Sequence, residues 1–215
     1  MSASGTLPCN GAILAGGAAS RFGGTPKGLA LVGGRRILDR VAGALTQVSD
    51  ALLLVANAED APRWLPYASV IRDEVRDVGA LGGLHAALSH TRGALLAVAW
   101  DMPFLSPSLL GELRRLGEAG VTDPTNPVDA VVPESTPDGA LEPLCAYYGP
   151  GCLAAAHAAL ASGEFRLGAF LARLRVQRVS HARVLDWGDP RRLFFNVNTP
   201  GALLDARRLA CPTDD

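Results

Sequence analysis

The chain has no excess charge of either sign and no long apolar segment. Its 215 residues carry 20 Lys and Arg against 21 Asp and Glu, so no overall positive charge attracts nucleic acid or an anionic membrane. No apolar run approaches the ~20 residues that a membrane-spanning helix needs, and the N-terminal residues do not resemble a signal peptide. We therefore expect a cytoplasmic protein that binds neither nucleic acid nor membrane, and any bound anion must meet a local site.

Cysteine is scarce. The four cysteines are Cys9, Cys145, Cys152 and Cys211, and no two of them form a CxxC pair. A disulfide framework is typical of shorter chains with closer cysteines, so the sequence favours reduced thiols, as found in a cytosol.

The residues that are abundant predict a folded α/β protein. Hydrophobic residues make up 48% of the chain, enough to close a core without crosslinks. Gly 24 and Pro 15 indicate many tight loops. The length predicts one domain over residues 1–215, with an ordered core at about 10–210.

Apolar runs of strand length alternate with helical patterns. Strands are predicted at 11–15, 51–56, 69–72, 94–100, 128–132, 144–148 and 176–179. Helices are predicted at 36–48, 82–91, 107–118, 151–161, 167–174 and 200–210, with a loop at 120–127 and a hairpin-like segment at 134–140. This order favours a Rossmann-like, doubly wound and mostly parallel sheet with helices on both faces.

A glycine-rich loop follows the first predicted strand. Residues 14–27 read LAGGAASRFGGTPK, with the glycine pair Gly16 and Gly17 and the cations Arg21 and Lys27. In a parallel sheet, ligands bind at the carboxyl ends of the strands. Glycines there let backbone amides approach phosphate oxygens, and the two cations supply mobile positive charge. The alternative is a turn-rich connection with solvated basic residues, which this combination within 14 residues makes the less favoured interpretation.

Several other chemistries lack their motifs. Lys27 follows Pro26 and not a Walker A glycine, and no GxGxxG pattern for a dinucleotide is present. Ser20 has no GxSxG context for acyl transfer. His85 and His90 lie five residues apart, about 140° around a helix, and so do not share a face for zinc.

Acidic and amide side chains end three of the predicted strands. Asp101 follows the apolar run 94–100 directly, where a hard oxygen ligand suits Mg²⁺ together with substrate phosphates. Asp73 ends the strand at 69–72, and Asn57 follows the strand at 51–56, where an amide could bind base edges. Three alternatives remain open: Asp101 could cap the following turn, Asp73 could form a salt bridge with Arg72 or Arg76, and Asn57 could have a plain turn role.

The loop, taken with later segments, resembles the nucleotidyltransferase family of molybdenum cofactor guanylyltransferases. The family signature LAGGxSxRMGxxK is similar to residues 14–27. Further similar blocks are Ile71–Asp73, Gly79–Gly83, Asp101–Phe104, Leu141–Tyr148 and Asn196–Pro200. Together the blocks span about residues 11–205. The resemblance implies the fold of nucleotide-diphospho-sugar transferases and transfer of GMP from GTP to molybdopterin, with release of pyrophosphate.

The resemblance also implies roles for individual residues. Catalysis falls to Lys27, Arg21 and Asp101, with Asp101 as the Mg²⁺ ligand. The residues implied to bind GTP are Leu14, Ala15, Gly16, Gly17, Lys27, Asn57, Asp73, Gly79 and Asp101. The acceptor side is implied to comprise Glu142, Asn196 and Asn198, although Asn residues that satisfy loop backbone are an alternative for the last two.

Three other functions remain as alternatives. CTP-dependent transfer to molybdopterin is one, but cytidylyl members usually read LAAG where this chain has Leu14-Ala15-Gly16-Gly17. Transfer to a sugar or alditol phosphate is another, and a non-catalytic nucleotide-binding accessory protein is the third. GTP and molybdopterin are the expected substrates, and transient contact with molybdopterin-carrying or molybdoenzyme-chaperone proteins is also expected.

Overall fold

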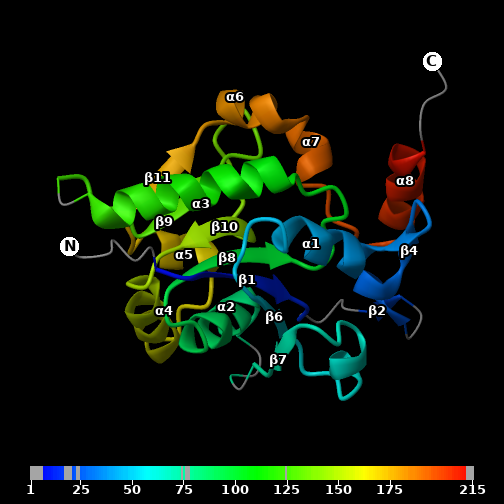
Figure 1. The fold of residues 1–215 in the computed structure, drawn as a ribbon, viewed down its shortest axis with the longest axis horizontal. Coiled ribbons are helices and arrows are strands. Elements are labelled where there is room, and N and C mark those ends of the chain that lie inside the picture. The colour runs from blue at the N-terminus through cyan, green and yellow to red at the C-terminus, as the bar shows by residue number, and fades with distance from the viewer. Residues whose placement is uncertain are drawn as a thin grey trace.

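The core of the structure is a seven-stranded sheet with helices on both faces (Figure 1). The computed structural model describes residues 7–16, 21–22, 25–73, 75, 78–123 and 125–211. Along the sheet the strand order is β11-β9-β10-β8-β1-β6-β7. The strands are β1 (Cys9–Leu14), β6 (Leu52–Val55), β7 (Ser69–Ile71), β8 (Ala94–Ala99), β9 (Ala130–Pro133), β10 (Cys145–Tyr148) and β11 (Val176–Val179).

Two layers of helices cover the sheet. The larger helices are α1 (Ile37–Leu45), α2 (Ala80–Ser89), α3 (Pro107–Thr122), α4 (Cys152–Ala161) and α8 (Pro200–Ala210), and the short ones are α5 (Leu167–Leu171), α6 (His181–Val184) and α7 (Pro190–Leu193). Helices α1 and α3 lie on one face, and α2 and α4 on the other (Figure 1). Alternate β8 residues enter two separate apolar clusters, with Leu96 and Val98 facing α1 and α3, and Leu95 and Ala97 facing α2 and α4.

The parallel strands end at one common edge of the sheet. Strand β1 pairs in parallel with β6 and β8, so that Leu14 lies beside Val55 and Ala99. Strand β7 pairs in parallel with β6, which places Ile71 beside Val55. The residues that follow these four positions therefore emerge side by side, as the predicted doubly wound sheet requires.

Strand β10 runs against its neighbours. It is antiparallel to both β8 and β9, while β11 is parallel to β9. The prediction of a mostly parallel sheet is confirmed, and the reversal has a consequence for the site. Because Cys145 pairs with Val98, the residues just before β10 lie at the edge where β8 ends.

The structure differs from the sequence prediction in its short elements. Two small hairpins, β2 (Arg21–Phe22) with β3 (Thr25–Pro26) and β4 (Leu31–Val32) with β5 (Arg35–Arg36), were not predicted. Helix α3 continues to Thr122, so the predicted loop at 120–127 begins too early. Gly120 allows the last turn of the helix to pack against Val128, because any larger residue would place a Cβ only 2.6 Å from the Val128 side chain. Among the described residues, no helix has the length and apolarity to cross a bilayer.

Candidate active site

A buried ion pair lies at the edge where the parallel strands end. Lys27 Nζ is 2.5 Å from Asp101 Oδ2, and the two residues are only 6% and 5% exposed. The ammonium group also donates to Asn198 Oδ1 at 2.6 Å. Three predicted site residues from distant parts of the chain thus meet at one point, as the sequence predicted for Lys27 and Asp101.

Packing against a tryptophan positions Lys27. The residue begins a short 3₁₀ helix, Lys27–Leu29, and the next residue, Gly28, lies against the ring of Trp100. A Cβ on Gly28 would be 2.3 Å from Cε3 of that ring, so only glycine allows this approach. Trp100 itself is 1% exposed and stacks on Trp64 with ring centroids 5.6 Å apart. Trp100 therefore lies in the core, directly before Asp101 in the sequence.

The late Asn-Val-Asn loop is tied to the end of β8. The Val197 amide donates to the Asp101 carbonyl oxygen at 2.9 Å, which holds this loop beside the carboxylate. Asn196 turns its side chain back into the loop, where Nδ2 donates to the Phe194 carbonyl at 3.0 Å. The two asparagines therefore have different partners. The Asn196 side chain bonds within its own loop, whereas the Asn198 side chain bonds to Lys27 of the ion pair.

A cluster of rings and one guanidinium joins the same two loops. Phe104, three residues after Asp101, meets Phe195 edge-on with ring centroids 6.3 Å apart. The Arg192 guanidinium lies 5.1 Å from the centroid of the Phe104 ring. Sequence reasoning missed this contact, although Phe104 lies within one motif block and Phe195 directly precedes another.

Asp73 and Asn57 form a second polar group at this edge. Asn57 Oδ1 accepts a hydrogen bond from the Asp73 amide at 2.9 Å, so the two predicted residues do meet. Burial raises the pKa of Asp73, partly offset by the Val75 amide, which donates to Oδ1 at 3.1 Å, and by His85. The carboxylate lies against helix α2, where a Cβ on Gly82 would be 2.7 Å from Oδ2.

Glu142 lies at the same edge, just before β10. Burial, aided by the negative charge of Asp101, raises the pKa of Glu142 to about 7, although the Leu144 amide opposes the shift. The Glu142 amide donates to the Pro133 carbonyl at 2.9 Å, which fixes the segment. The structure thus places this predicted acceptor-side residue near enough to Asp101 for their charges to interact.

The start of the glycine-rich loop continues directly from β1. Leu14 and Ala15 are both 6% exposed, and the Ala15 amide donates to the Val55 carbonyl at 2.9 Å. Gly16 is exposed, and a Cβ there would meet no atom within 4 Å. Gly16 therefore presents open backbone at the edge of the sheet.

The structure describes the other loop residues only in part. Gly17 and the side chain of Arg21 lie outside the described residues, although the Arg21 backbone belongs to β2. Gly79 directly precedes α2, and its φ of +64° is a conformation that favours glycine.

The donor set beside Lys27 fits a hard divalent cation. Asp101 supplies a carboxylate and Asn198 an amide oxygen, and the Lys27 ammonium already occupies a cation position against both. Within the described residues, no group of three or more His, Cys, Asp and Glu side chains is placed to hold a metal. Such a site suits an ion that takes its remaining ligands from substrate phosphates and water.

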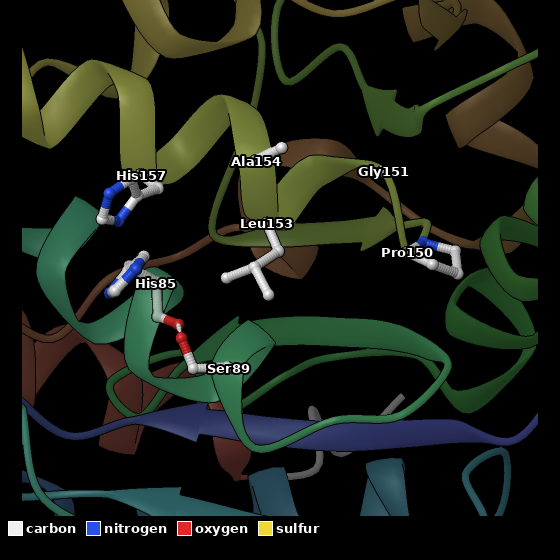
Figure 2. Close-up of a pocket in the computed structure, with 7 residues that line it drawn as sticks. All are labelled: His85, Ser89, Pro150, Gly151, Leu153, Ala154 and His157. Atoms are coloured by element: carbon white, nitrogen blue, oxygen red, sulfur yellow. Dashed lines mark hydrogen bonds between the residues drawn. The ribbon is translucent and has the colours of Figure 1, made fainter.

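A separate surface cavity lies between α2 and α4 (Figure 2). The rings of His85 and His157 approach from the two helices, with centroids 5.8 Å apart. The cavity is lined by His85, Ser89, Pro150, Gly151, Leu153, Ala154 and His157. None of these residues belongs to the predicted site. Within this cavity the contact of His85 is with His157.

Known proteins resemble the chain over nearly its whole length. A family model described as the MobA-like NTP transferase domain matches residues 11–179. The chain is 34% identical to a probable molybdenum cofactor guanylyltransferase of Pelotomaculum thermopropionicum, over 95% of this chain and 94% of that protein. It is 32% identical to the molybdenum cofactor guanylyltransferase of a Bradyrhizobium species, over 100% and 99% of the two chains.

One solved structure gives the same picture. The crystal structure of molybdopterin-guanine dinucleotide biosynthesis protein A from Archaeoglobus fulgidus superposes with a TM-score of 0.75 at 28% identity. The match covers 93% of this chain and 97% of that one. The chain therefore shares its fold with that protein.

Proposed function

The chain belongs to the MobA-like NTP transferase family and is a nucleotidyltransferase, and we propose that it transfers GMP from GTP to molybdopterin. A terminal phosphate oxygen of the acceptor attacks the α-phosphorus of GTP. The bond from that phosphorus to the bridging oxygen breaks, and pyrophosphate leaves with the electron pair. The products are the molybdopterin guanine dinucleotide and pyrophosphate.

One observation carries the chemical part of this proposal. The buried pair of Lys27 and Asp101 lies at the carboxyl edge of a parallel sheet, where the glycine-rich loop begins. A buried ion pair is costly to desolvate and is weak evidence for stability. Its position, however, provides a cation for phosphates and a carboxylate for a metal at a single point.

Positioning and charge do the work in this mechanism. Lys27, together with Arg21, neutralises charge on the departing pyrophosphate. Asp101 would hold Mg²⁺, and the ion would supply positive charge to offset that of the nucleotide phosphates. Gly16 and Gly17 admit the phosphates to the loop backbone. No side chain needs to become a covalent nucleophile, because transfer of this kind can run on orientation and electrostatics.

The remaining residues divide between the two substrates. We assign Leu14, Ala15, Asn57, Asp73 and Gly79 to the nucleotide, and Glu142, Asn196 and Asn198 to the acceptor side. The Asn57–Asp73 hydrogen bond supports the first group, because it joins the Asn57 side chain to the Asp73 backbone at the edge near the loop. The charge interaction between Glu142 and Asp101 supports the second.

Pyrophosphate release tests the proposal. We expect purified protein with GTP, Mg²⁺ and molybdopterin to release pyrophosphate, and to do so more slowly with CTP. Asp101→Asn and Lys27→Ala should each lower the rate by about 10²–10³-fold, the usual cost of removing one electrostatic contact to a transition state. Asp205→Asn, on exposed α8, is the matched control and should keep the normal rate.

Two results would contradict the proposal. Nucleotide binding without pyrophosphate release would favour an accessory protein on this fold. A preference for CTP or for a sugar phosphate acceptor would assign the chain to another nucleotidyltransferase class.

The cellular setting is also a proposal. All four cysteines are free, and Cys9, Cys145 and Cys152 are buried, as a reducing cytoplasm allows. We place the whole chain there as one catalytic domain, in transient contact with proteins that carry molybdopterin or receive the product.

A further inference from the structure

Lys27 is the one lysine among the 215 residues. The chain has 20 Lys and Arg residues in all, and the other 19 are arginines. Its ammonium group bonds at once to Asp101 Oδ2 at 2.5 Å and to Asn198 Oδ1 at 2.6 Å. These partners lie 74 and 171 residues away in the sequence. One side chain therefore holds the candidate metal ligand and an acceptor-side residue together.

This arrangement occupies the place that a divalent ion needs. A cation that bonds to Asp101 must come within about 2–3 Å of the carboxylate oxygen. The Lys27 ammonium is already at that distance, and the pair is nearly inaccessible to solvent. Two cations crowded onto one buried carboxylate repel each other strongly, since charges there are poorly screened.

A triphosphate changes this balance. Its oxygens carry several negative charges and compete for the ammonium group more strongly than a single carboxylate and an amide. Lysine suits such an exchange because its charge is compact and its stem flexible, whereas arginine prefers a fixed planar geometry. The Asn198 backbone need not move, because the neighbouring Val197 amide stays bonded to the Asp101 carbonyl.

We propose that Lys27 acts as a latch, by which we mean that its ammonium group occupies the side-chain oxygens of Asp101 and Asn198. A nucleoside triphosphate then draws the ammonium group away and makes both side chains available. The triphosphate then enters first, and its arrival exposes Asp101 to the divalent cation and Asn198 to substrate. This inference rests on the proposed function for the identity of the triphosphate. It adds an order of binding that the reaction alone does not require.

Metal binding in the absence of acceptor tests the latch. Mn²⁺ serves as the probe, because electron paramagnetic resonance measures the concentration of the free ion. Without nucleotide, we expect Lys27→Met to bind Mn²⁺ at least about tenfold more tightly than the wild type, equivalent to about 1.4 kcal/mol. Lys27→Arg, the matched control that keeps the charge, should bind as weakly as the wild type.

A double variant identifies where the ion binds. Lys27→Met combined with Asp101→Asn should lose the tight Mn²⁺ binding. Equal Mn²⁺ affinity of the nucleotide-free wild type and Lys27→Met overturns the latch, and so does tight binding that survives in the double variant.

A measurement on the wild type avoids any folding defect of the variants. Removing Lys27 leaves the buried Asp101 carboxylate without its partner, which destabilises the fold. Selective ¹³C labelling of lysine gives a single side-chain resonance in this chain, because no second lysine exists. GTP without metal should shift that resonance, and Mn²⁺ should broaden it only when GTP is present. Broadening by Mn²⁺ alone would contradict the latch.

The two proposals fail differently. The latch is decided by Mn²⁺ and lysine signals measured with GTP and no acceptor. The proposed function is decided by pyrophosphate release with molybdopterin present. A protein that turns over normally and binds Mn²⁺ freely before GTP would keep the function and lose the latch.

Discussion

Glu142 keeps its proton at pH values where an exposed glutamate has lost it. Burial raises its pKa from 4.5 to about 7, with help from the charge of Asp101. Below pH 4.5 the folded and unfolded chains both hold this proton. Between pH 4.5 and 7 only the folded chain holds it fully, so the stability due to Glu142 falls as the pH rises through this window.

Glu142→Gln should remove that fall. Glutamine preserves the shape of the neutral carboxyl group but does not titrate. Urea unfolding at pH 5 and pH 8 should show the wild type losing about 2 kcal/mol more than the variant over this interval. Carboxylates with lowered pKa values, such as Asp50 and Asp129, do not interfere, because they are ionised in both states above pH 5. Parallel pH dependences for the two proteins would mean that Glu142 is ionised in the fold.

At the scale of an element, helix α2 carries two adjacent glycines with different surroundings. A Cβ on Gly82 would lie 2.6 Å from Val78 and 2.7 Å from the Asp73 carboxylate, whereas a Cβ on Gly83 meets its nearest atom, on Val55, at 3.6 Å. Alanine at position 82 must therefore displace both Val78 and Asp73, while alanine at position 83 fits at ordinary contact distance.

This difference predicts that only one of the two substitutions affects nucleotide binding. Because we assign Asp73 to the nucleotide, Gly82→Ala should weaken GTP binding about tenfold, or ~1.4 kcal/mol. Gly83→Ala should bind GTP normally and gain up to about 1 kcal/mol of stability from its better helix propensity. Calorimetric GTP titrations of both variants measure this. Equal GTP affinity in the two variants would remove Asp73 from the nucleotide site.

Helix α3 offers a second pair of glycines, which reports on packing alone. A Cβ on Gly117 would be 2.2 Å from the ring of buried Tyr147, while one on Gly111 would be 3.5 Å from Val48. Gly117→Ala should destabilise the protein by about 1–3 kcal/mol through overpacking against β10. Gly111→Ala should be neutral or stabilising by up to about 1 kcal/mol. Denaturant midpoints that rise together in both variants would show that α3 does not press on Tyr147.

At the scale of the whole molecule, periodicity explains what the sequence could predict. The seven predicted strands and six predicted helices all correspond to observed elements, because most of them are long enough to repeat an apolar pattern. The hairpins β2–β3 and β4–β5 have strands of two residues each, too short for any period. The short helices α6 and α7 escaped prediction for the same reason.

The sequence allowed us to predict which residues belong to the candidate site, but not which of them contact one another. Lys27 and Asp101 each follow local signals, a glycine-rich loop and the end of an apolar strand. The bond of Lys27 to Asn198 spans 171 residues, and a local pattern does not specify contacts at that separation. The reversal of β10, which brings Glu142 to the same edge, likewise depends on tertiary packing.

Ligand binding at the candidate site should also raise the thermal stability of the whole protein. A ligand that binds only the folded chain stabilises it by about 2.7 kcal/mol at 100 times its dissociation constant. For a chain of this size, 1 kcal/mol raises Tm by about 2–4 °C. GTP with Mg²⁺ at such concentrations should therefore raise the Tm by about 5–10 °C, and GTP with EDTA by clearly less.

The part of this Tm increase that requires Mg²⁺ should depend on the Asp101 carboxylate. Asp101→Asn should show the same Tm with GTP whether Mg²⁺ or EDTA is present, since the variant lacks the carboxylate that we assign to the ion. Mg²⁺ alone should leave the Tm of the wild type unchanged, because Lys27 already neutralises Asp101 before the triphosphate arrives. If Asp101→Asn retains the full Mg²⁺ increment, the ion binds elsewhere and the buried pair has only a structural role.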